Sequence, residues 1–361
     1  MRPLPGSAPL GSAPLGDARS RRPSGVRGVP DTAVRPPSAH RSLHPRLAAL
    51  VGVATLTAAF AVARPTGLSG LEVVAALARW GVYGGTLVAG GGVLFRWWVH
   101  DAQGAAAEDR AMATWIQVAV VLAGAATLLG LAAQAALVAG SASAMADAEA
   151  VARAADGSFG LSMVARLVGL VAIAHAVTHV GARWAAWQAR AGAALALASF
   201  VWVGHSSTAQ PRSLAVASDL VHLGAAAGWT GGLLLLGIVL RHRRYEEDAS
   251  GAAAVVARFS SFAAGSVVAL FASGAAMTLL VVTSFTDLVG HEHGRTVLSK
   301  TGLVLAVLVA AAYNHRRLVP RLPRAGPEAW ARLRLAIGVE IAGLVVILLV
   351  TALLVGLATP A

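Results

Sequence analysis

The sequence contains no cysteine among its 361 residues. This absence excludes disulfide bonds, thiolate zinc sites, iron–sulfur ligation and a CxxC copper relay. Charged residues are also scarce, at 13% of the chain, and Lys300 is the one lysine. So low a charged fraction is unusual for a soluble domain of this size, and it indicates a protein that is largely surrounded by lipid.

Long apolar runs take the place of the missing charges. Hydrophobic residues make up 57% of the chain, and blocks of about 20 such residues are typical of helices that span a bilayer. The sequence therefore predicts an all-α, polytopic membrane bundle of about nine transmembrane helices, an eight-helix core with one extra N-terminal helix. The predicted spans are 47–63, 71–99, 112–140, 161–180, 185–203, 213–240, 255–284, 297–314 and 335–357.

The N-terminal region differs in composition from the rest. Residues 1–46 are rich in Pro, Gly, Ser and Arg, which predicts a disordered basic cytoplasmic tail before a membrane domain at 47–361. The predicted first helix ends in Ala61-Val62-Ala63, which resembles a signal-peptidase site. The basic region before it is too long for a typical signal, so we expect this helix to stay uncleaved, with cleavage as the alternative.

The net charge of +12 comes from arginines in the tail and in alternate loops, a pattern that indicates membrane orientation rather than nucleic-acid binding. We therefore expect a multi-pass protein of the inner membrane with its N-terminus in the cytoplasm and its C-terminus outside. The segments predicted to be cytoplasmic hold Arg96, Arg110, Arg183, Arg190, Arg241, Arg243, Arg244, Arg258 and the run from Arg316 to Arg334, and the opposite loops hold only Arg64, Arg153, Arg212 and Arg295.

Two ionisable residues lie three positions apart inside the predicted span 213–240. Asp219 and His222 share one face of a helix at this spacing. Ionisable groups within the bilayer are costly and are kept mainly where they function. A carboxylate beside a histidine fixes the imidazole tautomer or ligates a metal itself. A hydrogen-bonded pair that locks helix packing is the alternative.

Three more histidines fall on the same, outer side in this topology. His205 precedes the helix of His222, and the sequence His291-Glu292-His293 lies between the seventh and eighth predicted spans. Imidazole and carboxylate ligands suit Cu(II) or Zn(II), and histidine also holds Cu(I). We expect at least one of the three histidines to approach His222 and form a metal site with it. For the His291–His293 loop, a solvated polar loop is the alternative.

Two histidines on the predicted span 161–180 leave three interpretations open. His175 and His179 share a helix face near the inner interface, where an inner exit site, haem ligation and ordinary polar packing all fit. Arg166 lies nearer the outer end of the same span, where we expect it to snorkel or to pair with Asp219. The glycines Gly84, Gly85 and Gly90 to Gly92 predict close helix approach in the span 71–99.

These residues, taken in order, resemble the copper resistance D (CopD) family of integral membrane proteins. The resemblance is clearest over residues 200–320 and extends weakly upstream to Arg79 and Gly91 to Phe95. It rests on Gly204-His205, Asp219-Leu220-Val221-His222, Ala225 to Trp229, Gly231-Gly232-Leu233, Arg258-Phe259-Ser260, Gly294-Arg295, Lys300 and Asn314-His315-Arg316.

The resemblance implies a membrane protein of copper uptake or copper homeostasis that is not an enzyme. Its partners would be the lipid bilayer and an extracytoplasmic copper-binding protein, with no nucleic acid. His205, His291 and His293 would capture copper at the outer face, and His222, steadied by Asp219, would be the first ligand within the membrane. The alternatives are a b-type cytochrome, with haem between His222 and His175 or another membrane histidine, and a copper sensor or assembly factor without transport.

Overall fold

The computed structural model describes residues 69–100, 106–179, 181–203, 209–245, 249–281, 292–317 and 327–355. Every regular element in these ranges is a helix. The short elements are η1 (Ala142–Ala146), α4 (Ala148–Ala154) and η2 (Ser199–Trp202). The long helices are α2 (Gly70–Trp98), α3 (Ala106–Ala139), α5 (Gly157–Thr178), α6 (Arg183–Ala198), α7 (Arg212–Tyr245), α8 (Ala249–Val281), α10 (Glu292–Arg317) and α11 (Pro327–Leu354).

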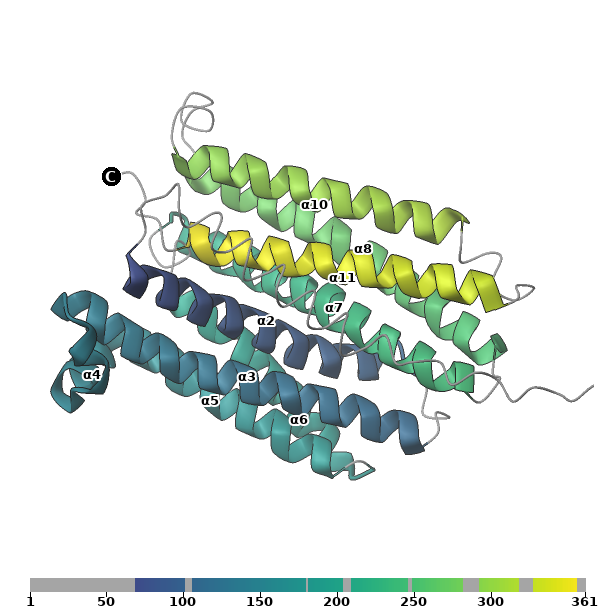
Figure 1. Ribbon diagram of the computed structural model, residues 1–361, viewed down its shortest axis with the longest axis horizontal. Coiled ribbons are helices and arrows are strands. Elements are labelled where there is room, and N and C mark those ends of the chain that lie inside the picture. The colour runs from purple at the N-terminus through teal and green to yellow at the C-terminus, as the bar shows by residue number, and fades with distance from the viewer. Residues whose placement is uncertain are drawn as a thin grey trace, which may run out of the picture. The chain divides into compact units, whose positions relative to one another are not determined.

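The long helices form a membrane bundle, as the sequence predicts. Among the described residues, six helices are long and apolar enough to cross a bilayer, namely α2, α3, α5, α7, α8 and α11. The helices α6 and α10 run alongside them (Figure 1). Large apolar side chains such as Val138 and Leu279 are exposed on the outside of the helices, which suits contact with lipid. The predicted helix at 47–63 and the tail at 1–46 lie outside the described residues.

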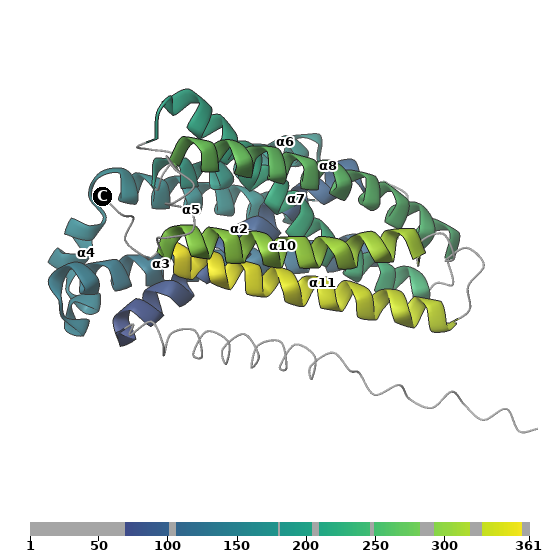
Figure 2. The ribbon, with the colours of Figure 1, turned by 90° about the horizontal axis from the view of Figure 1, so that it is seen from above.

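Successive long helices run in alternating directions, so the bundle has two distinct ends. We call the end at which α2, α5, α7 and α10 finish the arginine-rich end, because Arg96, Arg190, Arg243 and Arg258 lie near it. The opposite end is where these four helices begin. Figure 2 shows α10 and α11 side by side along the bundle, and the two helices pack directly against each other.

Local signals explain where α2 and α3 start and stop. Ser69 and Glu72 form a reciprocal capping box at the start of α2, in which the Ser69 Oγ accepts from the Glu72 N–H at 3.3 Å and the Glu72 Oε2 accepts from the Ser69 N–H at 2.6 Å. This box satisfies two amide donors that the helix leaves unpaired. Gly140, with φ at 69°, follows the last residue of α3, as glycine commonly does at a helix end.

Helix α2 lies at the centre of the packing and contacts α3, α6, α7 and α11. Its tightest crossing is with α7. A Cβ atom built on Gly91 would lie 1.8 Å from the Ala227 carbonyl oxygen, and one built on Gly231 would lie 2.8 Å from the Gly91 Cα. The prediction that the glycines of this helix permit close approach is therefore confirmed, because any side chain at Gly91 would overlap the backbone of α7.

Candidate metal centre

Helix α7 carries Asp219 and His222 about two turns from its start at Arg212. The first residues of α7 lie at the end of the bundle opposite the arginine-rich end, so both residues lie in the third of the helix that is farthest from the arginine-rich end. His222 and Asp219 are half-buried. Their spacing places them on the same side of α7, about one turn apart. The expectation that they share a face of a membrane helix is met.

A serine on the neighbouring helix α8 holds the imidazole of His222. The His222 Nδ1 lies 3.1 Å from the Ser273 Oγ, and the Ser273 hydroxyl donates to the Ala269 carbonyl oxygen at 2.6 Å. A hydroxyl has one proton, which the Ala269 carbonyl takes, so the Ser273 oxygen is an acceptor for a ring in the Nδ1–H tautomer. In that tautomer the lone pair is on Nε2, the form in which an imidazole binds a metal.

A second polar cluster lies around Tyr83 of helix α2 and Arg166 of helix α5. The Tyr83 ring stacks on Phe200 with centroids 4.8 Å apart. The guanidinium of Arg166 lies over the same Phe200 ring, with its Cζ 4.3 Å from the ring centroid. Phe200 therefore contacts both the Tyr83 ring and the Arg166 guanidinium.

Arg166 is buried rather than snorkelling, so that part of the sequence expectation is wrong. Its side chain is 7% exposed. Its Nε donates to the Ser199 Oγ at 3.1 Å and its Nη2 to the Ser162 Oγ at 3.0 Å. Two hydroxyls and an aromatic face offset the cost of removing the guanidinium from water. The printed sequence shows two serines 37 residues apart, and nothing in their spacing signals that they meet.

The other predicted ligands lie outside the part of the chain that can be described. His205 and His291 fall in the gaps at 204–208 and 282–291. The backbone of His293 belongs to the first turn of α10, and its side chain is not described. Among the described residues there is no group of three or more His, Asp or Glu side chains able to hold a metal. The convergence of His205, His291 and His293 on His222 stays a prediction.

His175 and His179 lie at the end of α5, at the arginine-rich end, and both are exposed. Their ring centroids are 4.6 Å apart, and both rings contact Trp184. Helix α5 packs on α3 and α6, whereas α7 packs on α2 and α8. The arrangement therefore gives no support to haem ligation by His175 with His222.

Sequence reasoning missed a buried charged cluster at the arginine-rich end. The carboxylate of Glu108 accepts from the Arg243 Nε at 3.2 Å and from its Nη2 at 3.4 Å, with both side chains buried. The His100 Nδ1 lies 3.1 Å from the same carboxylate. A pair 135 residues apart ties the start of α3 to the end of α7. The sequence did contain one signal for this cluster: Glu108 and Asp109 are adjacent acidic residues in a chain whose charged residues are mostly arginines.

Comparison with known protein families relates the chain to copper resistance proteins. A model described as the N-terminal domain of copper resistance protein D-like proteins matches residues 69–212. A second model, described as copper resistance protein D, matches residues 253–354. The chain belongs to the copper resistance protein D family. In this copper resistance D protein the segment of Asp219 and His222 lies between the two matched ranges.

One curated relative of the copper resistance D protein is the copper transport protein CutJ of Bacillus subtilis (strain 168). The two are 27% identical over 140 residues, which are 39% of this chain and 26% of the relative. The chain thus matches about a quarter of that relative's length. No solved structure matches the chain. The family and the apolar helices together make this a multi-pass membrane protein with a copper-related function.

Proposed function

We propose that this copper resistance D protein takes up copper through the plasma (inner) membrane, with His222 as the first ligand inside the bilayer. The observation that carries the proposal is the hydrogen bond between the His222 Nδ1 and the Ser273 Oγ at 3.1 Å. In the Nδ1–H tautomer this bond leaves the lone pair on Nε2, and we propose that this part of the membrane-crossing helix α7 lies toward the exterior. A histidine fixed in this way is prepared for a metal before the metal arrives.

The chemistry around His222 suits a copper ion as cargo. Imidazole nitrogen binds both Cu(I) and Cu(II), and carboxylate oxygen binds Cu(II). Asp219, one turn away on the same helix, adds a negative charge that lowers the cost of bringing a cation into the bilayer. His205, His291 and His293 are the proposed capture ligands at the outer face, and Asp219 either ligates copper or steadies His222.

The direction of transport follows from the proposed orientation. Arginines gather at one end of the bundle, and the positive-inside rule assigns that end to the cytoplasm. His222 then lies toward the exterior, where imported copper arrives, and an extracytoplasmic copper-binding protein is the proposed donor. No ATP-binding motif stands in the sequence, so the proposed driving force is a copper gradient or the donor protein.

The test of the proposal is copper accumulation by cells that express His222→Ala. Growth at limiting external copper, with metal measured by mass spectrometry, should show a fall of about tenfold in transporter-dependent copper, because a neighbouring carboxylate does not replace the lost imidazole. The matched control is His242→Ala, a histidine near the other end of the same helix, which should accumulate copper normally.

Two outcomes would replace this proposal. Equal copper accumulation by His222→Ala and wild-type cells, at equal amounts of membrane-inserted protein, would remove the transport role of His222. A Soret band in the purified wild-type protein that is lost in His222→Ala would make the protein a b-type cytochrome, the alternative that the histidines first suggested.

A further inference from the structure

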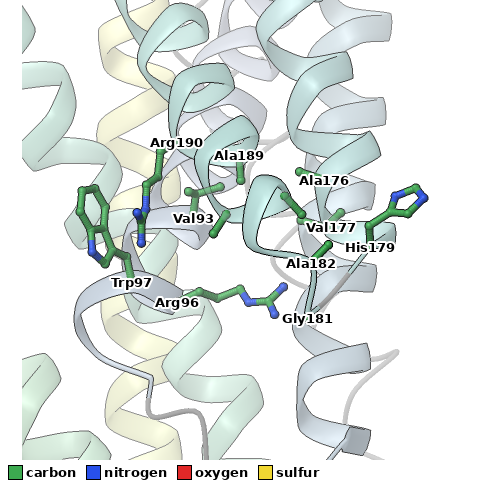
Figure 3. A pocket seen from close by; sticks show the side chains of 12 residues that line it. Val93, Arg96, Trp97, Ala176, Val177, His179, Gly181, Ala182, Ala189 and Arg190 are labelled. Carbon is green, nitrogen blue, oxygen red and sulfur yellow. The ribbon is translucent and has the colours of Figure 1, made fainter.

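A cavity of about 200 Å³ opens at the arginine-rich end, between the last turn of α2 and the turn that joins α5 to α6. Its lining combines an apolar floor with two guanidinium groups. Val93, Val177 and Ala189 belong to the floor, and Arg96 and Arg190 stand at its side. Figure 3 shows the two arginines approaching the cavity from α2 and α6, with Arg96 extended toward Gly181. The proposed copper path does not use this cavity.

The two arginines give the cavity an excess of positive charge. Arg190 lies against indole rings, with its Cζ 3.8 Å from the Trp97 ring centroid and 5.1 Å from that of Trp187. Stacking on a ring face leaves the N–H donors at the edge of the guanidinium directed outward. Within the described ranges no carboxylate forms a salt bridge with Arg190, and Arg96 has one such partner, Asp109, at 3.3 Å. One carboxylate, that of Asp109, therefore offsets the charges of two guanidinium groups, those of Arg96 and Arg190.

This charge disfavours a metal cation as the occupant. His179 also lines the cavity, but its imidazole points away from the two arginines in Figure 3. Its Nδ1 is engaged by the Thr178 hydroxyl and the His175 carbonyl, each at 2.9 Å. The cavity therefore offers a cation two repelling guanidinium groups and no directed ligand, whereas an anion with oxygen acceptors meets N–H donors from two arginines.

Exposed tryptophans place the cavity at the membrane surface. Trp97, Trp98, Trp184 and Trp187 are between 45% and 69% exposed, and all four lie at the arginine-rich end. Tryptophan gathers at the depth of lipid headgroups, where its ring contacts acyl chains and its N–H contacts water. A cavity at this depth is open both to headgroup phosphates and to the apolar part of the lipid.

From the two arginines, the apolar floor and the tryptophan belt we infer that this cavity binds the phosphate of an anionic phospholipid. Arg96 and Arg190 donate to the phosphate oxygens, and the apolar floor receives the start of the acyl region. Basic pockets between membrane helices bind anionic headgroups in this manner. The site joins α2, the helix at the centre of the packing, to the α5–α6 hairpin.

The full-length protein, purified, stripped of lipid and then incubated with equal amounts of phosphatidylglycerol and phosphatidylcholine, provides the test. Native mass spectrometry should show retained phosphatidylglycerol in preference to phosphatidylcholine. Each of Arg96→Gln and Arg190→Gln should weaken retention of phosphatidylglycerol about fivefold, since one basic residue near a headgroup contributes about that much. The matched control is Arg110→Gln, an exposed arginine at the same end that does not line the cavity, and it should bind like the wild type.

Three results would overturn the inference. Equal retention of the two lipids by the wild type would show that the cavity does not select a negative headgroup. An equal loss of binding in Arg110→Gln would show that surface charge alone attracts the lipid. Competition by inorganic phosphate at millimolar concentration would identify the ligand as a soluble anion. Should a Gln variant fail to fold, Arg190→Lys keeps the charge, loses the fork-shaped donor set, and should still reduce retention.

Discussion

At the scale of single residues, one serine positions His222. The Ser273 hydroxyl donates to the Ala269 carbonyl oxygen and lies 3.1 Å from the His222 Nδ1, for which it is an acceptor in the Nδ1–H tautomer. Removal of this acceptor frees the ring to rotate and to exchange its tautomer. Partners of this kind typically contribute 10- to 100-fold in metal affinity.

We therefore expect Ser273→Ala to weaken copper binding by about tenfold while the protein stays folded. Isothermal titration with copper, on purified full-length protein, measures the change. Ser261→Ala is the matched control, because Ser261 lies on the same helix, makes the same hydroxyl-to-carbonyl bond to Ala257, and is exposed. Unchanged affinity in Ser273→Ala would show that the serine does not position the ligand.

Sequence reasoning proposed Asp219 and His222 as site residues because an ionisable pair inside an apolar run stands out without any structure. It did not find Ser273, which lies 51 residues from His222. Serine is common in membrane helices, and which serine meets which histidine depends on how α7 and α8 are rotated against each other. That rotation follows from side-chain packing such as Phe262 against Gly228, which is a tertiary property.

At the scale of elements, the crossing of α2 and α7 permits no side chain. The Gly91 and Gly231 backbones are in direct contact, so an added methyl group must push the helices apart. We expect Gly91→Ala to destabilise the protein by about 2 kcal/mol or more. Thermal unfolding in detergent, followed by circular dichroism, measures the loss.

Gly84→Ala on the same helix is the control for this substitution. A Cβ there would lie 3.9 Å from the Leu348 Cδ1, an ordinary contact distance. This variant should unfold at the wild-type temperature or slightly above it, because alanine favours helix more than glycine does. A Gly91→Ala protein as stable as Gly84→Ala would mean that the two helices do not touch at this point.

The long helices were predictable from the sequence, and their ends less so. The run 213–240 corresponds to α7 at Arg212–Tyr245, and the run 112–140 corresponds to α3 at Ala106–Ala139. Hydropathy marks the part of a helix that lies in lipid, whereas the helix continues into water as long as its residues favour it. Buried pairs such as Glu108 with Arg243 support these extensions, and no hydropathy pattern reveals them.

At the scale of the whole molecule, the start of α8 and the end of α11 lie at opposite ends of the bundle. The arginine distribution assigns the α8 start to the cytoplasm. We expect a tag beside Ser250 to be cytoplasmic and a tag at the C-terminus to be outside. Accessibility of each tag to an impermeant reagent in intact cells measures both positions. A C-terminal tag that is reached only after lysis would invert the proposed direction of copper movement.

The glycine crossing also constrains how the protein moves. Helices that touch through side chains can slide, because rotamers change as they pass, but two backbones in direct contact have no such adjustable layer. Helices α2 and α7 therefore behave as one rigid body around Gly91 and Gly231. An opening between α7 and α8 at His222 that keeps this contact intact would have to move α8 away from the α2–α7 pair. The imidazole belongs to α7 and Ser273 belongs to α8. Their hydrogen bond therefore crosses the interface between these helices, and such a motion would stretch it.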